Sequence, residues 1–351
     1  MEKNKKYNPI VSVVMPCYNA MPYLPEALDS ILNQTYSNIE ILCINDGSSD
    51  ETAKVLEKYA KKDNRIQVIH NETNLRLIAT LNKGIQMAKG EYIARMDADD
   101  ISSLNRIELQ LQVLLSNENI DIVSTGAYFI SESGEIVGKN LVRNTSKVGT
   151  IFSSFLYRPI GHAELLAKAT VLKENPYASE ANTLHAEDYE LWTRLIRKGY
   201  ILTNMSDFLY CVRLNSNSVS RKFTSIQNKN FWKSLKIHHE KFFNLELEDH
   251  IAKIIANRFY KPKLLNVKKG IRIINELKKE FIKNNKKNKS EIIYIYKTHI
   301  IDISYQLIKS GSFLVKLYSL YLVLVRVNLI FSKKCITYVF HKFNFSINTK
   351  K

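Results

Sequence analysis

The first hundred residues alternate between short β-branched runs and amphipathic segments, and this alternation restricts the fold more than any other feature of the chain. Apolar runs typical of buried strands lie at residues 10–16, 39–46, 66–70 and 91–96. Segments with helical spacing follow the first three runs, at residues 25–34, 51–61 and 75–88. Strands that alternate with helices of this length predict βαβ units, and therefore an α/β fold with a mostly parallel sheet flanked by helices.

Polar residues stand where three of these runs end. They are Cys17-Tyr18-Asn19, Asn45-Asp46 and Asp97-Ala98-Asp99. Because ligands of open α/β sheets bind beyond the carboxyl ends of the parallel strands, we expect all three at one edge. The chain has no Gly-x-Gly-x-x-Gly after the first run and no P-loop motif, which argues against a Rossmann dehydrogenase and a P-loop NTPase.

Three carboxylates lie within four residues, at Asp97, Asp99 and Asp100. Such crowding is unfavourable unless a cation or solvent offsets the repulsion. Mg²⁺ and Mn²⁺ prefer oxygen ligands, commonly one or two carboxylates together with substrate phosphates. The pattern favours a metal held against a nucleotide diphosphate. The alternative is a solvated acidic turn before a helix that starts near Ser102, which Asp100 would cap.

A second acidic group occurs at the start of another predicted helix. Apolar residues at 191, 192, 195 and 196 indicate this helix, and its first turn carries Glu187 and Asp188. The helix dipole stabilises carboxylates at this position, so capping is an alternative to a catalytic role. Residues 121–130 are expected to form a further strand that pairs with residues 135–142, whereas residues 144–185 show no clear pattern.

The positive charge of the chain is concentrated after residue 220. Residues 221–351 contain 28 Lys and Arg against 8 Asp and Glu, whereas residues 1–220 have a net charge of −3. Such a basic region suggests an anionic partner, either a membrane surface or nucleic acid. Because aliphatic runs separate the basic residues and no nucleic-acid-binding motif is present, we expect no nucleic acid.

The segment 313–331 is nearly long enough to span a bilayer, but it contains Lys316 and Arg326. A charge at mid-membrane costs roughly 3 kcal/mol. We therefore expect an interfacial helix, with a helical subdomain packed on the catalytic domain as the alternative. The four scattered cysteines and the lack of a secretory signal predict a cytoplasmic protein, peripheral at the inner face of the membrane.

Four motifs resemble those of family 2 glycosyltransferases in sequence, order and spacing. They are Val11-Ser-Val-Val-Met-Pro-Cys-Tyr-Asn19, Ile44-Asn-Asp-Gly-Ser-Ser-Asp50, Ala94-Arg-Met-Asp-Ala-Asp-Asp100 and Ala186-Glu-Asp-Tyr-Glu-Leu-Trp192. Residues 90–95 and 210–220 are most similar to bacterial enzymes that add hexose or hexosamine to lipooligosaccharide or capsule chains. The similarity covers about residues 9–220.

The resemblance implies a GT-A fold and defines the expected domains. Residues 1–220 would form the catalytic domain, with the nucleotide-sugar half at about 9–118 and the acceptor half at about 119–220. Residues 221–351 would form a basic helical region that associates with an anionic membrane surface. The expected reaction is inverting transfer from a UDP-sugar to a lipid-linked or polysaccharide acceptor, with Mn²⁺ or Mg²⁺ as cofactor.

The resemblance also implies roles for individual residues. Asp188 would be the base, with Glu187 beside it, and Asp99 would bind the metal. Asp97 would contact the metal or the ribose. The remaining nucleotide-sugar contacts would be Pro16, Tyr18, Asn19, Asp46, Arg76, Asn82 and Ala98.

The chain departs from the family pattern at Arg76 and at Leu81, which precedes Asn82. Arg76 would either contact the diphosphate or lie on the surface at a helix start. His162 and Arg213 are candidate contacts to the acceptor or the diphosphate. The structural alternatives are a hydrogen-bonded structural histidine and a surface arginine.

Two other functions share parts of this pattern. A nucleotidyltransferase can use the same sheet and an acidic metal site, but Cys17-Tyr18-Asn19-Ala20 is not the Gly-rich basic loop of that class. A non-catalytic, membrane-associated protein that binds nucleotide sugars is the other alternative. The presence of Asp46, Asp97, Asp99 and Asp188 argues against it.

Overall fold

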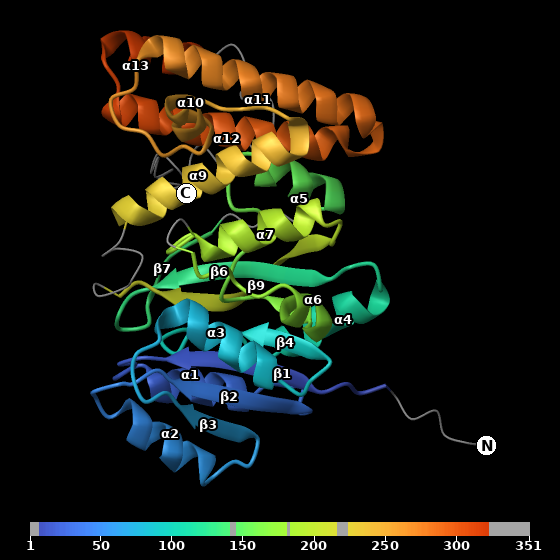
Figure 1. The fold of residues 1–351 in the computed structure, drawn as a ribbon, viewed down its shortest axis with the longest axis vertical. Coiled ribbons are helices and arrows are strands. Elements are labelled where there is room, and N and C mark those ends of the chain that lie inside the picture. The colour runs from blue at the N-terminus through green and yellow to red at the C-terminus, as the bar shows by residue number, and fades with distance from the viewer. Residues whose placement is uncertain (1–6, 141–144, 181–182, 216–223, 323–351) are drawn as a thin grey trace, which may run out of the picture. The chain divides into compact units, whose positions relative to one another are not determined.

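The computed structural model describes residues 7–140, 145–180, 183–215 and 224–322 (Figure 1). The chain divides into two compact units, which we call the α/β unit (1–147 and 160–227) and the helical unit (148–159 and 228–351). Residues 148–159, which the sequence places in the catalytic domain, thus belong to the helical unit. The functional division at residue 220 stays a prediction.

Nine strands of the described residues form the single sheet of the α/β unit. They are β1 (Val11–Cys17), β2 (Ile39–Asn45), β3 (Ile66–His70), β4 (Tyr92–Arg95), β5 (Ile101–Ser102), β6 (Ile122–Ile130), β7 (Ile136–Lys139), β8 (Leu166–Lys168) and β9 (Leu202–Arg213). The strand order is β3-β2-β1-β4-β8-β6-β9-β5, with β7 paired to β6. The first four strands follow one another across the sheet in Figure 1.

The first four strands are parallel, as the sequence predicts. Cys17 of β1 pairs with Asn45 of β2, and Val14 pairs with Arg95 of β4. The strands β1, β2 and β4 therefore run in the same direction, and their carboxyl ends share one edge. Beyond β4, the strand β8 is antiparallel to both of its neighbours, which makes the sheet mixed.

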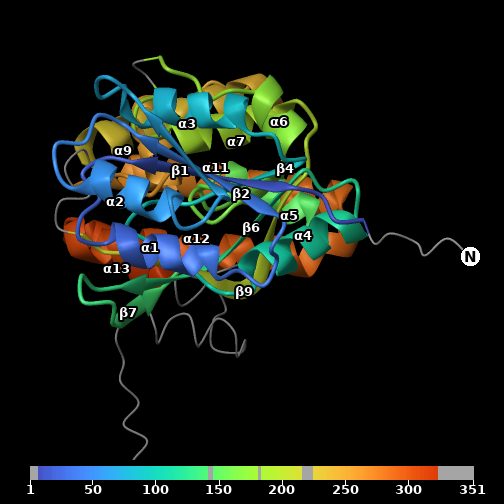
Figure 2. The same ribbon diagram turned by 90° about the horizontal axis from the view of Figure 1, so that it is seen from below.

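Helices cover both faces of this sheet. They are α1 (Leu24–Leu32), α2 (Thr52–Ala60), α3 (Arg76–Met87), α4 (Arg106–Ser116), α6 (Ala169–Glu174) and α7 (Glu187–Arg197). Figure 2 shows α1 and α4 on one side of β1, β2 and β4, and α3 and α6 on the other. A Cβ atom at Gly84 of α3 would lie 2.7 Å from the Val14 side chain and 2.8 Å from that of Ile44, so the glycine permits close helix-to-sheet packing.

The segment after the three carboxylates differs from the prediction. Residues Ile101–Ser102 form β5, antiparallel to β9, and the next helix begins only at Arg106 with Asn105 as its N-cap. Asp100 therefore does not cap that helix. The run of polar residues predicted an early helix start. Pairing with β9, more than a hundred residues away, makes these residues a strand instead.

Of the expected hairpin, Ile136–Lys139 pairs with β6 as predicted, while residues 141 and 142 lie outside the described residues. Within 144–185, which showed no sequence pattern, lie α5 (Lys147–Ser154), β8 and α6.

The helical unit has a core of its own. Besides α5 it contains α9 (Thr224–Phe243), α10 (Asp249–Ile255), α11 (Leu264–Asn284), the short η1 (Lys286–Asn288), α12 (Lys289–Ser310) and α13 (Phe313–Tyr321). The aromatic rings of Phe152 and Phe155 pack against Phe281 at 5.1 and 5.9 Å between centroids. The prediction of a mainly helical carboxyl-terminal region is confirmed by these helices.

Among the described residues, no helix has the length and apolar content needed to cross a bilayer. The part of the predicted interfacial segment 313–331 that the structure describes is α13 and Leu322, and residues 323–331 lie outside it.

Two adjacent histidines of α9 are buried against the loop after α5. His238 Nε2 lies 2.8 Å from Ser154 Oγ, and its ring stacks on that of Phe155 at 4.2 Å. His239 Nε2 lies 3.0 Å from the carbonyl oxygen of Phe155. Burial lowers the pKa of His239 to about 4, although the hydrogen bond to this carbonyl acts in the opposite direction.

The helical unit should therefore lose stability in mild acid. Unfolded His239 takes up a proton near pH 6.5, whereas the folded side chain does so only near pH 4, so the free energy of unfolding falls by up to about 3 kcal/mol as the pH drops through this range. His239→Gln should flatten the pH dependence by this amount in urea denaturation. His250→Gln, on the exposed surface of α10, is the control and should keep the parent's pH dependence. Equal slopes for the parent and His239→Gln would contradict the assignment.

Candidate active site

The turn after β2 is hydrogen-bonded to the segment before α3. Asp46 is buried, and its Oδ1 accepts hydrogen bonds from the Leu75 amide and from Asn71 Nδ2, both at 2.8 Å. Gly47 has a φ of +67°, and a Cβ there would lie 2.9 Å from the Asn74 nitrogen. Only glycine fits this turn without strain, and the turn fixes the orientation of the Asp46 carboxylate.

The end of β1 is joined to the same turn through Asn19, which has a φ of +47°. Its amide donates to Ser48 Oγ at 3.0 Å, and its Oδ1 accepts from the Ser49 amide at 2.8 Å. Tyr18 beside it is 53% exposed, and Pro16 is half-buried. The first two polar strand ends therefore form one connected surface at the predicted edge.

The third strand end depends on a buried arginine. Arg95 Nη2 lies 2.6 Å from Asp97 Oδ1, and Nη1 lies 3.1 Å from Oδ2, so the guanidinium binds both carboxylate oxygens. The Arg95 side chain is 6% exposed and that of Asp97 is 34% exposed. Burial opposes the charge on Arg95, but the carboxylate of Asp97, together with smaller contributions from neighbouring groups, raises its pKa. The Asp97 amide donates to the Tyr210 hydroxyl at 3.0 Å.

Asp99 and Asp100 lie in different surroundings although they are adjacent. Asp100 is buried and accepts a hydrogen bond from the Arg213 amide at 2.8 Å. Asp99 is partly exposed, and burial together with the charge of Asp97 raises its pKa to about 6. The surroundings thus disfavour a negative charge on Asp99, although the charges of Arg213 and Arg95 partly offset this effect.

A divalent cation would offset this charge. Within the described residues, no three His, Cys, Asp or Glu side chains are grouped so that they could hold a metal by themselves. Asp97 and Asp99 are partly exposed, and one or two carboxylates completed by substrate phosphates is a usual arrangement for Mg²⁺. The residues present therefore fit a metal that binds together with a phosphorylated ligand.

Arg213 is buried, so the alternative of a surface arginine is wrong. Its side chain is 2% exposed, and Nη2 contacts the Glu26 carboxylate at 2.5 Å. Nη1 donates to the carbonyl oxygens of Ser131 at 3.2 Å and Glu132 at 3.0 Å, while Nε donates to that of Asp99 at 2.9 Å. In this structure Arg213 holds the loop of Asp99 in place, and a contact to the diphosphate stays a prediction.

Tyr177 connects the acidic strand end to the second acidic group. It is buried, and burial raises the pKa of its hydroxyl. The negative charges of Asp188, Glu187 and Asp97 raise it further, and the charge of Arg95 lowers it. Charge effects decline with distance, so these four side chains lie within electrostatic range of the Tyr177 hydroxyl. The two acidic motifs, ninety residues apart in sequence, therefore both influence the pKa of one buried side chain.

Two residues predicted to contact ligands help to place Tyr177. Asn82 Oδ1 accepts from the Tyr177 amide and Asn82 Nδ2 donates to the Tyr177 carbonyl, both at 2.9 Å. His162 is buried, with Nε2 2.8 Å from the Tyr177 hydroxyl. Asn82 and His162 thus form hydrogen bonds within the protein, and a direct contact of either residue with a ligand stays a prediction.

Glu187 and Asp188 form the first turn of α7 and are 8% and 7% exposed. The Tyr189 amide donates to Asp188 Oδ1 at 2.7 Å, which orients that carboxylate at the positive end of the helix dipole. Arg76 is exposed at the start of α3, and its charge contributes, after burial, to lowering the pKa of His185.

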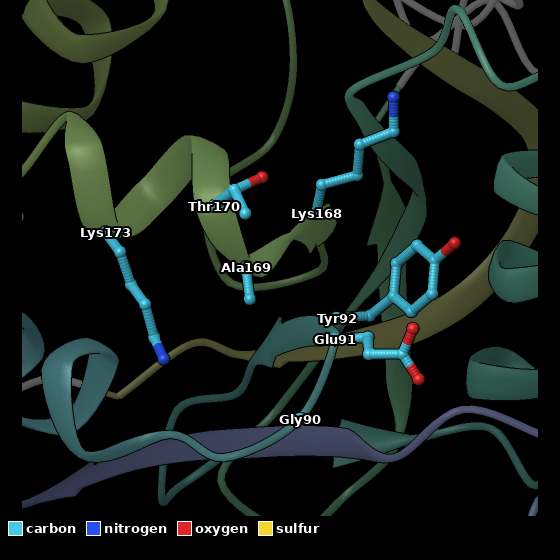
Figure 3. A pocket seen from close by; sticks show the side chains of 7 residues that line it. All are labelled: Gly90, Glu91, Tyr92, Lys168, Ala169, Thr170 and Lys173. Carbon is cyan, nitrogen blue, oxygen red and sulfur yellow. The ribbon is translucent and has the colours of Figure 1, made fainter.

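A pocket of about 360 Å³ lies away from this site (Figure 3). Its lining residues are Gly90, Glu91, Tyr92, Lys168, Ala169, Thr170 and Lys173. Tyr92 is the first residue of β4, so this pocket is at the amino end of that strand and contains none of the predicted site residues. Lys173 Nζ donates to the carbonyl oxygen of Ala88 at 2.6 Å, and Lys168 Nζ lies 3.0 Å from Asp121 Oδ1.

The sequence interpretation missed Arg95, Tyr177 and Tyr210. Arg95 had a usable signal, since a charged residue inside a run of buried strand residues requires a partner, and three carboxylates follow it. Tyr210 was seen only as part of a family motif. Tyr177 lies in the stretch without a recognisable pattern and had no signal.

Comparisons with known proteins show what the chain is similar to in sequence and in fold. The family model "Glycosyl transferase family 2" matches residues 12–166. An uncharacterised glycosyltransferase of Haemophilus influenzae is 36% identical over 232 residues, which cover 63% of this chain and 70% of that protein. The O-antigen biosynthesis glycosyltransferase WbnJ of Escherichia coli is 33% identical over 217 residues, 60% of this chain and 82% of that protein.

Two solved structures resemble the fold. The structure of S. aureus TarS 1–349 in complex with UDP has a TM-score of 0.52 and 17% identity, and the match covers 85% of this chain and 80% of that one. The mannosyltransferase PcManGT from Pyrobaculum calidifontis, in complex with GDP-Man and Mn²⁺, has a TM-score of 0.51 and 17% identity, covering 99% and 89%. The predicted GT-A architecture is confirmed.

Removal of the buried cation beside the carboxylates should destabilise the α/β unit. Arg95→Met leaves Asp97 without its partner and Asp100 buried among like charges, so we expect the free energy of unfolding to fall by about 3 kcal/mol or more in urea denaturation. Lys54→Met is the control. It breaks an exposed ion pair with Glu51 and should leave the stability unchanged. Equal stability of Arg95→Met and the parent would show that the buried pair contributes nothing.

Proposed function

The chain belongs to glycosyl transferase family 2, and we propose that it moves a hexose or N-acetylhexosamine from a UDP-sugar to a hydroxyl of a growing bacterial surface glycan, such as lipooligosaccharide or capsule, with inversion. One observation carries the proposal. The polar ends of β1, β2 and β4 share one edge of the sheet, and the charges of Asp97, Glu187 and Asp188 all raise the pKa of one buried hydroxyl, that of Tyr177. A strand end suited to a metal and a diphosphate thus lies close to a pair of carboxylates suited to an acceptor.

The donor nucleotide would bind along the first two strand ends. Tyr18 has an exposed ring for contact with the base, beside Pro16 and Asn19. Asp46, whose Oδ1 is held by two donors, would accept from the uracil imide or the ribose. Exposed Arg76 is the candidate partner for the diphosphate, and Ala98 would contact the donor between the two aspartates.

The departing diphosphate needs positive charge as the glycosidic bond breaks. Mn²⁺ or Mg²⁺, when bound, would supply it as a Lewis acid between the carboxylate and the phosphates. Asp99 is the ligand we propose, because Arg95 already binds both oxygens of Asp97 and leaves that residue for the ribose or a second contact. The Mn²⁺ present in the PcManGT structure supports a metal at such a site.

The acceptor hydroxyl needs a base as its oxygen attacks the anomeric carbon. Asp188 would take this proton, and inversion requires no second carboxylate because no covalent intermediate forms. The Tyr189 amide orients Asp188 at the positive end of the α7 dipole, where a negative charge is favoured. Glu187 would orient the acceptor or the site beside it.

The acceptor is proposed to be lipid-linked or part of a polysaccharide, with the enzyme peripheral at the inner face of the cytoplasmic membrane. The excess of Lys and Arg after residue 220 supports an anionic surface as partner. The name of the relative WbnJ, an O-antigen biosynthesis enzyme, supports a surface glycan as product.

A panel of nucleotide sugars tests the class of donor. We expect slow hydrolysis of one UDP-sugar in the presence of Mn²⁺ or Mg²⁺. The release of UDP, measured in a coupled assay, reports this hydrolysis. Turnover of only GDP- or CMP-sugars would contradict the proposed donor, and turnover of none would contradict the proposed activity.

Asp188→Asn should remove the base and keep the donor site. Transfer should fall about 10²-fold to 10⁴-fold, with UDP-sugar affinity by calorimetry within about twofold of the parent. Glu190→Gln, two residues along α7 and paired with Arg194, is the matched control and should retain transfer. Loss of donor binding in Asp188→Asn would instead place Asp188 in the donor site or in the fold.

Asp99→Asn should remove the gain in UDP affinity that Mn²⁺ provides. We expect at least a tenfold loss of affinity with Mn²⁺ present and little change in EDTA, because the substitution removes the charge that binds the metal. Asp207→Asn, on an exposed part of β9, should behave as the parent in both titrations. An unchanged affinity for UDP in the presence of Mn²⁺ would rule out Asp99 as the metal ligand.

A further inference from the structure

The helix α13 has apolar residues on two opposite faces. On its inner face Val315 is fully buried, and Ser319 Oγ donates to the Ser304 carbonyl of α12 at 2.8 Å. On the opposite face, Phe313, Leu314, Leu317 and Tyr321 are 75%, 62%, 47% and 45% exposed. At 3.6 residues per turn these four side chains lie within an arc of about 100°. We call them the outer face of α13.

Basic side chains border this face. Lys316 is exposed on α13 itself, and Lys268 Nζ of α11 lies 5.8 Å from the ring centroid of Tyr318, which stacks on Tyr321. Further exposed cations on α11 are Lys269 and Arg272, which contact Glu248 and Glu276. Residues 224–322 contain 20 Lys and Arg against 8 Asp and Glu. The outer face is therefore apolar with a positive border.

We propose that the outer face of α13 inserts into the interface of an anionic phospholipid bilayer. Phe313, Leu314, Leu317 and Tyr321 would lie at the boundary between head groups and acyl chains, and Lys268 and Lys316 would contact the head groups. The nine residues of α13 that the structure describes measure roughly 14 Å along the helix axis, about half the thickness of the hydrocarbon core. This inference rests on the proposed function in one respect only, which is the identity of the membrane that the protein contacts.

Other occupants explain fewer of these observations. Nucleic acid would neutralise the lysines but leave four exposed apolar side chains without a partner. A second copy of the chain would cover the apolar face but bring two strongly basic regions together, which is electrostatically unfavourable. An anionic bilayer is complementary both to the apolar face and to the positive border.

The test compares two double substitutions in the full chain. Leu314→Glu with Leu317→Glu alters the outer face. Ile136→Glu with Val137→Glu, at 63% and 58% exposed positions of β7, makes the same change in net charge and apolar content in the α/β unit. Cosedimentation uses vesicles of 30% phosphatidylglycerol and 70% phosphatidylcholine. We expect vesicle affinity to fall at least tenfold for the α13 variant and about twofold or less for the β7 variant.

Salt and lipid composition give independent readouts. The parent's affinity should fall as NaCl is raised from 0.1 to 0.5 M, and it should be weak for pure phosphatidylcholine. Equal vesicle binding by the α13 variant and the parent would overturn the proposal. So would equal losses in the two variants, because net charge alone would then account for binding.

Three further results would assign the face to another occupant and overturn the proposal. They are a parent dimer that becomes monomeric in the α13 variant, a melting temperature lowered by several degrees in that variant, and DNA binding that the substitution abolishes. The second result would mean that the chain itself covers the face. UDP-sugar hydrolysis without vesicles separates this proposal from the proposed function, because either property can be lost while the other is retained.

Discussion

The ion pair between Arg95 and Asp97 is the interaction on which the site depends. Three carboxylates follow β4 within four residues, and the buried ring of Tyr210 lies beside them. A buried cation beside such a group of acids favours their ionised form and lowers their mutual repulsion. Because Arg95 binds both oxygens of Asp97, it also distinguishes the two aspartates of the Asp-x-Asp motif. The carboxylate of Asp99 has no such bidentate arginine partner among the described hydrogen bonds.

The strand β9, which is the last of the described strands in sequence, completes this arrangement. β9 provides the Tyr210 hydroxyl for the Asp97 amide, the Arg213 amide for Asp100 and the Arg213 guanidinium for the Asp99 carbonyl. The acidic turn is thus fixed by residues more than a hundred positions away. A rigid turn of this kind lowers the cost of binding a metal and a diphosphate, because little ordering is left to occur on binding.

The two units have different electrostatic characters, and each suits a different partner. The α/β unit gathers carboxylates at the carboxyl ends of its parallel strands, where a metal and a nucleotide can neutralise them. The helical unit has an excess of lysine on its surface and an apolar outer face on α13. Its core rests on residues 148–159 as well as on the carboxyl-terminal helices, so it is not a simple extension of the chain.

Three features follow from the sequence without the structure: the alternation of strands and helices, the parallel direction of the first four strands, and the edge at which the polar residues lie. Local signals suffice for these features, because side-chain periodicity and turn-forming residues act over about ten positions. They predicted residues 66–70 as a strand with the bounds of β3, and placed Glu187 and Asp188 in the first turn of α7.

Tertiary structure alone decided which of these polar residues act on one another. The contacts that bury Arg213, attach Asn82 to Tyr177 and give Asp100 its partner all connect residues far apart in sequence. The same holds for the two acidic motifs that both influence the pKa of Tyr177. No periodicity encodes such contacts. A side chain's charge partners and its exposure to water depend on how the elements pack, and only the packed chain determines them.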